Sequence, residues 1–341
     1  MNLGGVGIVG SGGGFKGVYS MGFIEALYLK GIVPIFGEGV SINALMLAKL
    51  VASNWNVLEV KKIWLKVQEM GPSYIFDKGI LEMSLNLFRT RSSLSSNRKI
   101  VNLLLNNIDF QAIADSPIHF QAVTYNKTRR RQVIFSNKDA KVQQDPKLMA
   151  TAILASLSPP LLLPPIFMNG EWYSDGKMFR LGNAVRARCD TIFILFNGNL
   201  DSDPTDFGSL GIHKQWQAGQ MEESIMLIER EIRWAVSRGY DLIENNPSPI
   251  FEDIREMPKP KKIRRRLKHF ADSVLETVTA GADPEQVFIP HRIILLTVPK
   301  PIASLTITDF TGPNPRTKYP GDISLAMEQC SHLPDEFWAK L

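Results

Sequence analysis

Cysteine, histidine and uninterrupted apolar runs are all scarce in this sequence of 341 residues. The two cysteines, Cys189 and Cys330, stand far apart, so they provide neither a disulfide framework nor a zinc site, and we expect two buried or idle thiols. The most apolar stretch, residues 151–168, contains four prolines and is therefore not a regular membrane-spanning helix. The amino-terminal segment MNLGGVGIVG has no basic region and is broken by glycines, which is untypical of a signal peptide. We therefore expect a soluble cytoplasmic chain that meets a membrane, if at all, peripherally.

The overall composition is that of a folded protein. Hydrophobic residues make up 44% of the chain, which is enough for a sizeable core, and charged residues make up 21%, which excludes a disordered composition. The length suits one large α/β domain, or one domain with an extension. The formal net charge of +5 permits contact with an anionic surface without requiring it.

Apolar runs alternate with helical patterns at the start of the chain. We expect a strand at 6–10, a helix at 18–30, a strand at 32–36 and a helix from Ser41 to about residue 54. This order implies a parallel sheet with crossover connections. The sequence thus predicts the α/β fold class, with three layers (α/β/α) and a mostly parallel central sheet.

The rest of the chain continues this pattern. We expect residues 57–115 to be mainly helical apart from a loop around 89–98, with a hairpin at 119–125 and 131–135, a helix at 147–157, short strands at 172–175 and 190–196, a long helix at 215–244 and a final strand at 292–298. We expect residues 1–200 to form the core of the domain. Residues 201–341 complete the same domain, with a basic helical insertion at about 245–290.

A glycine cluster follows the first expected strand and precedes a helix. The segment Gly12-Gly13-Gly14-Phe15-Lys16-Gly17 fits a dinucleotide fingerprint, and Glu38 lies at a suitable distance downstream for a ribose contact. A glycine loop at a helix amino terminus is equally suited to offer backbone N–H groups to a developing oxyanion. A simple tight turn is a third interpretation, and this motif by itself does not choose between them.

A serine stands in the context that a nucleophile elbow requires. The segment Gly39-Val40-Ser41-Ile42-Asn43 follows a strand and opens a helix, so the Ser41 hydroxyl would project above the sheet. Gly39 provides the small neighbour that such a turn needs, whereas Asn43 stands where a second glycine is usual. Taken alone, Ser41 is more often interpreted as an ordinary helix cap.

A carboxylate further along is the candidate base. Asp175-Gly176 ends a short strand, and a carboxylate within hydrogen-bond reach can activate a serine without a histidine. An Asp-Gly pair in isolation usually marks a turn. The chain's histidines stand in no recognisable motif, although His291 and His332 come late enough to complete a Ser-Asp-His order; the full set is His119, His213, His269, His291 and His332.

Taken together, these motifs resemble the patatin-like phospholipase family over most of residues 6–200. Residues 10–17 are similar to the family's oxyanion-hole loop, residues 39–43 to its Gly-x-Ser-x-Gly elbow, and Asp175-Gly176-Lys177 to its Asp-Gly-Gly/Ala motif. The proline-rich approach at 149–165 also has a counterpart in the family. The resemblance implies a patatin-like fold, with residues 1–200 as its catalytic core.

The resemblance also implies roles. Ser41 would be the nucleophile and Asp175 the base of a dyad, and the loop containing Gly12, Gly13, Gly14, Lys16 and Gly17 would form the oxyanion hole, with the amides of Gly13 and Gly14 as donors. The implied substrate is a phospholipid, lysophospholipid or other lipid ester, with no metal or cofactor. The chain departs from the family at Asn43 and at Lys177. In addition, the Asn and Pro that usually follow the aspartate are not in their usual places within residues 178–183.

A basic segment suggests a membrane contact. Within Lys259–Lys268 most residues are basic, and apolar residues follow at near-helical spacing, as in helices that lie on anionic lipid. A solvated basic face is the plainer interpretation, and nucleic acid is not an expected partner because no recognisable module is present. Two rival functions remain: a degenerate patatin fold that serves as a lipid or protein interaction module, and a nucleotide-binding oxidoreductase.

Overall fold

The computed structural model describes residues 3–76, 93, 95–160, 162–197, 212–257, 291–298 and 321–341, with the side chains of 212–221 left aside. The basic segment Lys259–Lys268, most of the expected insertion at 245–290 and part of the loop expected around 89–98 lie outside the described residues.

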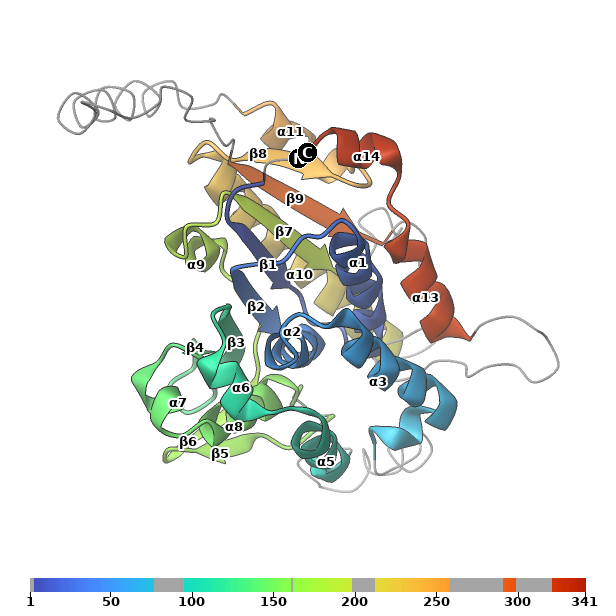
Figure 1. Ribbon diagram of the computed structural model, residues 1–341. Coiled ribbons are helices and arrows are strands. Elements are labelled where there is room, and N and C mark those ends of the chain that lie inside the picture. Colours follow the sequence, from blue (N-terminus) through green and yellow to red (C-terminus); the bar gives the residue numbers. More distant parts are fainter. Residues whose placement is uncertain are drawn as a thin grey trace.

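A nine-stranded, mostly parallel sheet forms the middle of the molecule (Figure 1). The strand order is β5-β6-β3-β2-β1-β7-β9-β8, and β4 pairs with β3 outside this path. The strands are β1 (Val6–Gly10), β2 (Phe36–Val40), β3 (His119–Asn126), β4 (Arg131–Ser136), β5 (Ile166–Met168), β6 (Glu171–Asp175), β7 (Thr191–Phe196), β8 (Asp241–Glu244) and β9 (Arg292–Thr297). Pairings from β3 through β2, β1, β7 and β9 to β8 are parallel, whereas β4, β5 and β6 pair antiparallel.

Helices cover both faces of this sheet, as the three-layer prediction requires. One core lies between the sheet and α1, α2, α3 and α13, and a second lies between the sheet and α9, α10 and α11 (Figure 1). Successive residues of β7 and β9 alternate between the two cores because side chains alternate along a strand. The helices are α1 (Gly17–Leu29), α2 (Ile42–Ala52), α3 (Val57–Met70), α5 (Arg98–Asn107), α6 (Phe110–Asp115), α7 (Ala140–Gln144), α8 (Lys147–Ser156), α9 (Leu181–Arg186), α10 (Ile212–Val236), α11 (Glu252–Arg255), α13 (Asp322–Ser331) and α14 (Asp335–Ala339).

Two expected elements are placed differently. The second strand is Phe36–Val40 rather than 32–36, and it runs directly into Ser41. Val33, which the prediction placed inside that strand, is 56% exposed in the connection before it. The long helix ends at Val236 instead of continuing to Glu244, because the chain turns through Gly239 (φ 94°) and enters the parallel strand β8.

Strand β3 changes its neighbour halfway along, and this change positions the site. Its first half pairs with β2, with Val123 opposite Val40, and its second half pairs with β6, with Thr124 opposite Asp175. The ends of β2 and β6 therefore meet beside β3. Since Ser41 follows Val40 directly, the topology brings Ser41 and Asp175 together from positions far apart in the sequence.

No described helix combines the length and the apolar character needed to cross a bilayer.

Candidate active site

Ser41 occupies a strained turn between β2 and α2. Its backbone angles are φ 55° and ψ −123°, a region that side-chain-bearing residues seldom adopt. The turn is tight enough that a Cβ on Gly39 would lie 2.4 Å from the backbone nitrogen of Ala44. The Ser41 N–H donates to the Ser156 hydroxyl at 2.8 Å, and that hydroxyl donates to the Val123 carbonyl at 2.7 Å. Buried Ser156 thus joins the turn to the middle of β3.

Asp175 lies beside Ser41 at the end of β6. Burial raises the pKa of its carboxyl well above the usual range, while a hydrogen bond with Ser41 and one from the Gly176 N–H lower it by less. Its Oδ1 atom is buried and has no hydrogen-bond partner among the described residues. Gly176 lets the chain turn there, because a Cβ would lie 2.6 Å from the Val123 carbonyl oxygen. Such desolvation makes a carboxylate a stronger base.

The glycine loop between β1 and α1 passes directly over Ser41. A Cβ on Gly12 would lie 3.3 Å from the Cβ of Ser41. Gly13 (φ 143°) and Gly14 (φ 56°) adopt backbone conformations that favour glycine. The same segment ends in a short 3-10 helix, η1 (Gly14–Lys16), which leads into α1. Gly12, Gly13 and Gly14 all line the pocket that contains the serine.

The last two residues of the expected oxyanion motif differ from each other in their surroundings. Lys16 lines the same pocket, and burial lowers the pKa of its ammonium group. Gly17 has a packing role, because a Cβ there would lie 2.5 Å from the Ile42 side chain. It allows the first turns of α1 and α2 to approach each other.

Asn43, in place of the second elbow glycine, is accommodated by a buried polar network. Its Nδ2 atom donates to the Ser11 carbonyl and to the Ser20 hydroxyl, the latter at 3.1 Å. Asn197 accepts from that hydroxyl at 2.6 Å and donates to the Gly12 carbonyl at 3.1 Å. These contacts hold the glycine loop from below. Space for the larger side chain comes from β1, where a Cβ on residue 10, a glycine, would lie 2.5 Å from the Asn43 Cγ.

Ser41, Asp175 and the glycine loop line one pocket of about 580 Å³. From this polar end the pocket extends between α2, α3 and α5, where nearly every side chain is apolar. Those apolar side chains include Leu45, Met46, Val60, Ile63, Trp64, Val67, Phe76, Ile100 and Leu103. The shape combines a reactive polar end with a long apolar wall, which suits a substrate with a hydrocarbon chain.

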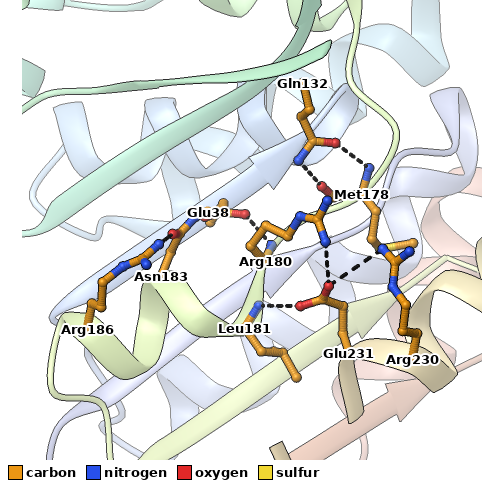
Figure 2. Close-up of polar contacts among 9 residues, drawn as sticks. All are labelled: Glu38, Gln132, Met178, Arg180, Leu181, Asn183, Arg186, Arg230 and Glu231. Atoms are coloured by element: carbon orange, nitrogen blue, oxygen red, sulfur yellow. Dashed lines mark hydrogen bonds and ion pairs between the residues drawn. The ribbon is translucent and has the colours of Figure 1, made fainter. Parts of the chain in front are cut away.

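A second polar cluster ties the segment after Asp175 to strand β2 (Figure 2). The buried carboxylate of Glu38 accepts hydrogen bonds from the Arg180 N–H and the Asn183 amide, both at 2.5 Å. Glu231 of α10 accepts from the Arg180 guanidinium at 2.9 Å and from the Leu181 N–H at 3.1 Å. Because Glu38 is fully buried in these contacts, the ribose-binding role that the dinucleotide interpretation gave it is wrong.

The histidines with described side chains all lie outside the pocket. His119, at the start of β3, hydrogen bonds to Ser136, and His291 lies 3.6 Å from Asp190 before β9. His332 follows α13 and contacts the neighbouring Ser331. The side chains of His213 and His269 are outside the described set. Within the described parts of the chain, no three His, Cys, Asp or Glu side chains gather closely enough to hold a metal ion.

Lys177, the other departure from the family pattern, lies at the pocket rim. Its ammonium group is 2.7 Å from the Glu223 carboxylate on α10, in an exposed ion pair. The ion pair links the segment after Asp175 to α10. Because both side chains are exposed, the pair contributes little stability.

Sequence reasoning passed over Asn197 and gave Ser156 no role. Asn197 follows directly after the buried strand β7. A polar residue at the carboxyl end of a parallel strand is a recognisable signal, because these ends meet at one edge. Ser156, at the end of an apolar helix, offers no comparable signal.

The geometry defines a class first: three-layer α/β proteins that present a serine on a strained strand–helix turn above a parallel sheet. The particular family follows from the sequence, since the family model described as patatin-like phospholipase matches residues 8–180. The chain belongs to the patatin-like phospholipase family, whose general activity is hydrolysis of lipid esters.

The chain is similar to VipD from Legionella pneumophila, with 15% sequence identity and a TM-score of 0.44 over 98% of this chain and 67% of the VipD chain. No curated protein sequence matches it.

Proposed function

We propose that this protein is a lipid acyl hydrolase of the phospholipase A or lysophospholipase type, acting through a Ser41–Asp175 dyad. The observation that carries the proposal is the placement of a strained serine and a desolvated carboxylate at the polar end of one long apolar pocket. The family's general activity supports the same conclusion.

In the proposed reaction, Asp175 accepts the Ser41 hydroxyl proton as the Ser41 oxygen attacks the ester carbonyl. Backbone N–H groups of Gly12, Gly13 and Gly14 stabilise the oxyanion. The carbonyl–oxygen bond to the leaving alcohol breaks, and Asp175 returns its proton to that alcohol. Water then attacks the acyl-enzyme, again with Asp175 as base, and releases the fatty acid and free Ser41.

A serine-directed fluorophosphonate probe tests the nucleophile. We expect the folded protein to be labelled at Ser41, as identified by peptide mass, and Ser41→Ala to remain unlabelled. Absence of labelling in folded wild-type protein would favour the rival function, an interaction module on the same fold.

A further inference from the structure

An exposed aromatic pair lies on the hairpin that precedes Asp175. Phe167 on β5 and Trp172 on β6 are register partners, with ring centroids 5.0 Å apart. Phe167 is 59% exposed and Trp172 is 48% exposed, which is unusual for two large adjoining apolar side chains. Tyr173, the next residue, is buried in the cluster that contains Met168. The pair therefore faces away from the α8 side of the sheet.

The same face of the sheet continues into the pocket. Trp172 and Ser174 lie on one face of β6 because side chains alternate along a strand. Ser174 pairs with Tyr125 of β3, and both residues line the pocket that contains Ser41. The aromatic pair thus lies on the β5–β6 hairpin (Figure 1), with Trp172 two residues along β6 from Ser174 in the pocket lining.

Basic residues follow one another beside the pair. The turn between β3 and β4 carries Lys127, Arg129 and Arg130, Arg131 begins β4, and all four are exposed. Backbone contacts fix this turn against the hairpin: the Lys127 N–H donates to the Trp172 carbonyl at 2.8 Å, and the Trp172 N–H donates to the Thr128 hydroxyl at 3.0 Å.

The hairpin contributes a carboxylate, Glu171, next to these basic residues. Glu171 pairs with Arg129, so the other basic side chains of the turn give the surface its net positive charge. Tryptophan, phenylalanine and basic residues together are the side chains that favour the interface of a bilayer with anionic lipid.

We propose that Phe167, Trp172 and the basic β3–β4 turn form the surface by which this protein docks on an anionic phospholipid bilayer, with the pocket rim toward the lipid. The inference rests on the proposed function for its lipid substrate, and it names a surface different from the Lys259–Lys268 segment. Docking here would bring the ester of a membrane phospholipid to Ser41 while the aromatic rings enter the headgroup region.

The test compares the double variant Phe167→Ser/Trp172→Ser with wild type and with Leu29→Ser. Leu29 is 70% exposed at the far end of α1, so it is a matched apolar control. We expect the double variant to bind vesicles of phosphatidylcholine and phosphatidylserine at least about tenfold more weakly, as loss of two inserted rings implies. Leu29→Ser is expected to bind as wild type does. Thermal midpoints verify folding.

Two further measurements distinguish membrane docking from ester hydrolysis. Hydrolysis of a soluble short-chain ester is expected to be unchanged in the double variant, because neither ring lines the pocket. Brominated lipid is expected to quench wild-type fluorescence more than that of Trp172→Phe. Unchanged vesicle binding by the double variant, as for a protein-docking surface, would overturn the inference. Absence of any ester hydrolysis together with lost vesicle binding would remove the proposed function and leave the surface standing.

Discussion

At the residue scale, Ser41 has an unfavourable backbone conformation and Asp175 has an unfavourable environment for its charge. Ser41 stores backbone strain, which persists because Gly39 and the Ser156 hydroxyl hold the turn. Asp175 pays an electrostatic penalty for ionisation because it is desolvated. The strained backbone and the desolvated carboxyl lie side by side, and residues with such unfavourable features cluster at functional sites.

The raised pKa of Asp175 predicts a pH profile. In the proposed reaction the carboxyl must be ionised to accept the Ser41 proton, so activity is expected to be lost as the pH falls through its pKa. We expect kcat/KM for a soluble ester to fall on the acid side with an apparent pKa well above the usual value of about 4 for aspartate. An acid limb near that usual value would contradict a desolvated base.

At the element scale, the β2–α2 turn depends on close contact between its two elements. We predict that Gly39→Ala lowers the free energy of unfolding by about 3 kcal/mol and abolishes probe labelling, because the new Cβ would meet the Ala44 backbone. Gly37→Ala is the matched control on the same strand, since its Cβ would lie 3.7 Å from Leu47, an ordinary contact. Urea unfolding measures both, and equal stability of the two variants would refute the prediction.

The same strand shows where sequence reasoning succeeds and where it fails. The alternation of strands and helices over the first part of the chain follows from local patterns, whereas β8 is hidden inside the helix expected at 215–244. The position of β2 does not follow from them either, because the strand is Phe-Gly-Glu-Gly-Val, and glycine and glutamate are poor strand residues. Tertiary contacts outweigh this propensity: Glu38 finds buried partners in Arg180 and Asn183.

The polar support of the site is also invisible to local patterns. The Asn43 side chain fits where the family has a glycine because the facing residue 10 on β1 is itself glycine and leaves room for it. That compensation joins positions that are neighbours only in the folded sheet. The contact of Ser156 with Ser41 depends in the same way on where β3 changes its partner.

At the scale of the whole molecule, the cluster around Glu38 joins β2, the segment after Asp175 and α10 (Figure 2). Burial raises the pKa of Glu38 to about 7 from 4.5; the charge of Glu231 adds to this rise, and Asn183 and Arg180 oppose it. Between these two pH values the folded protein holds a proton that the unfolded chain releases. The contribution of Glu38 to stability is therefore greatest at low pH and declines as the pH rises.

This sign gives a prediction for global stability. We compare the free energy of unfolding of the wild type with that of Glu38→Gln. The stability of the wild type relative to this variant is expected to fall by at most about 3 kcal/mol between about pH 5 and pH 8. Urea unfolding at both pH values measures the difference, with the exposed Glu256→Gln as control. A difference that stays constant with pH would show that Glu38 does not titrate in this range.

Release of fatty acid from mixed phospholipid vesicles measures the proposed ester hydrolysis by Ser41 on its expected substrate. We predict release by the wild-type protein, a loss of at least about a thousandfold in Ser41→Ala, and nearly the same loss in Asp175→Asn. Each variant must be shown to be folded. Release by folded Ser41→Ala at the wild-type rate would contradict the assignment of the nucleophile, and with it the account of the site.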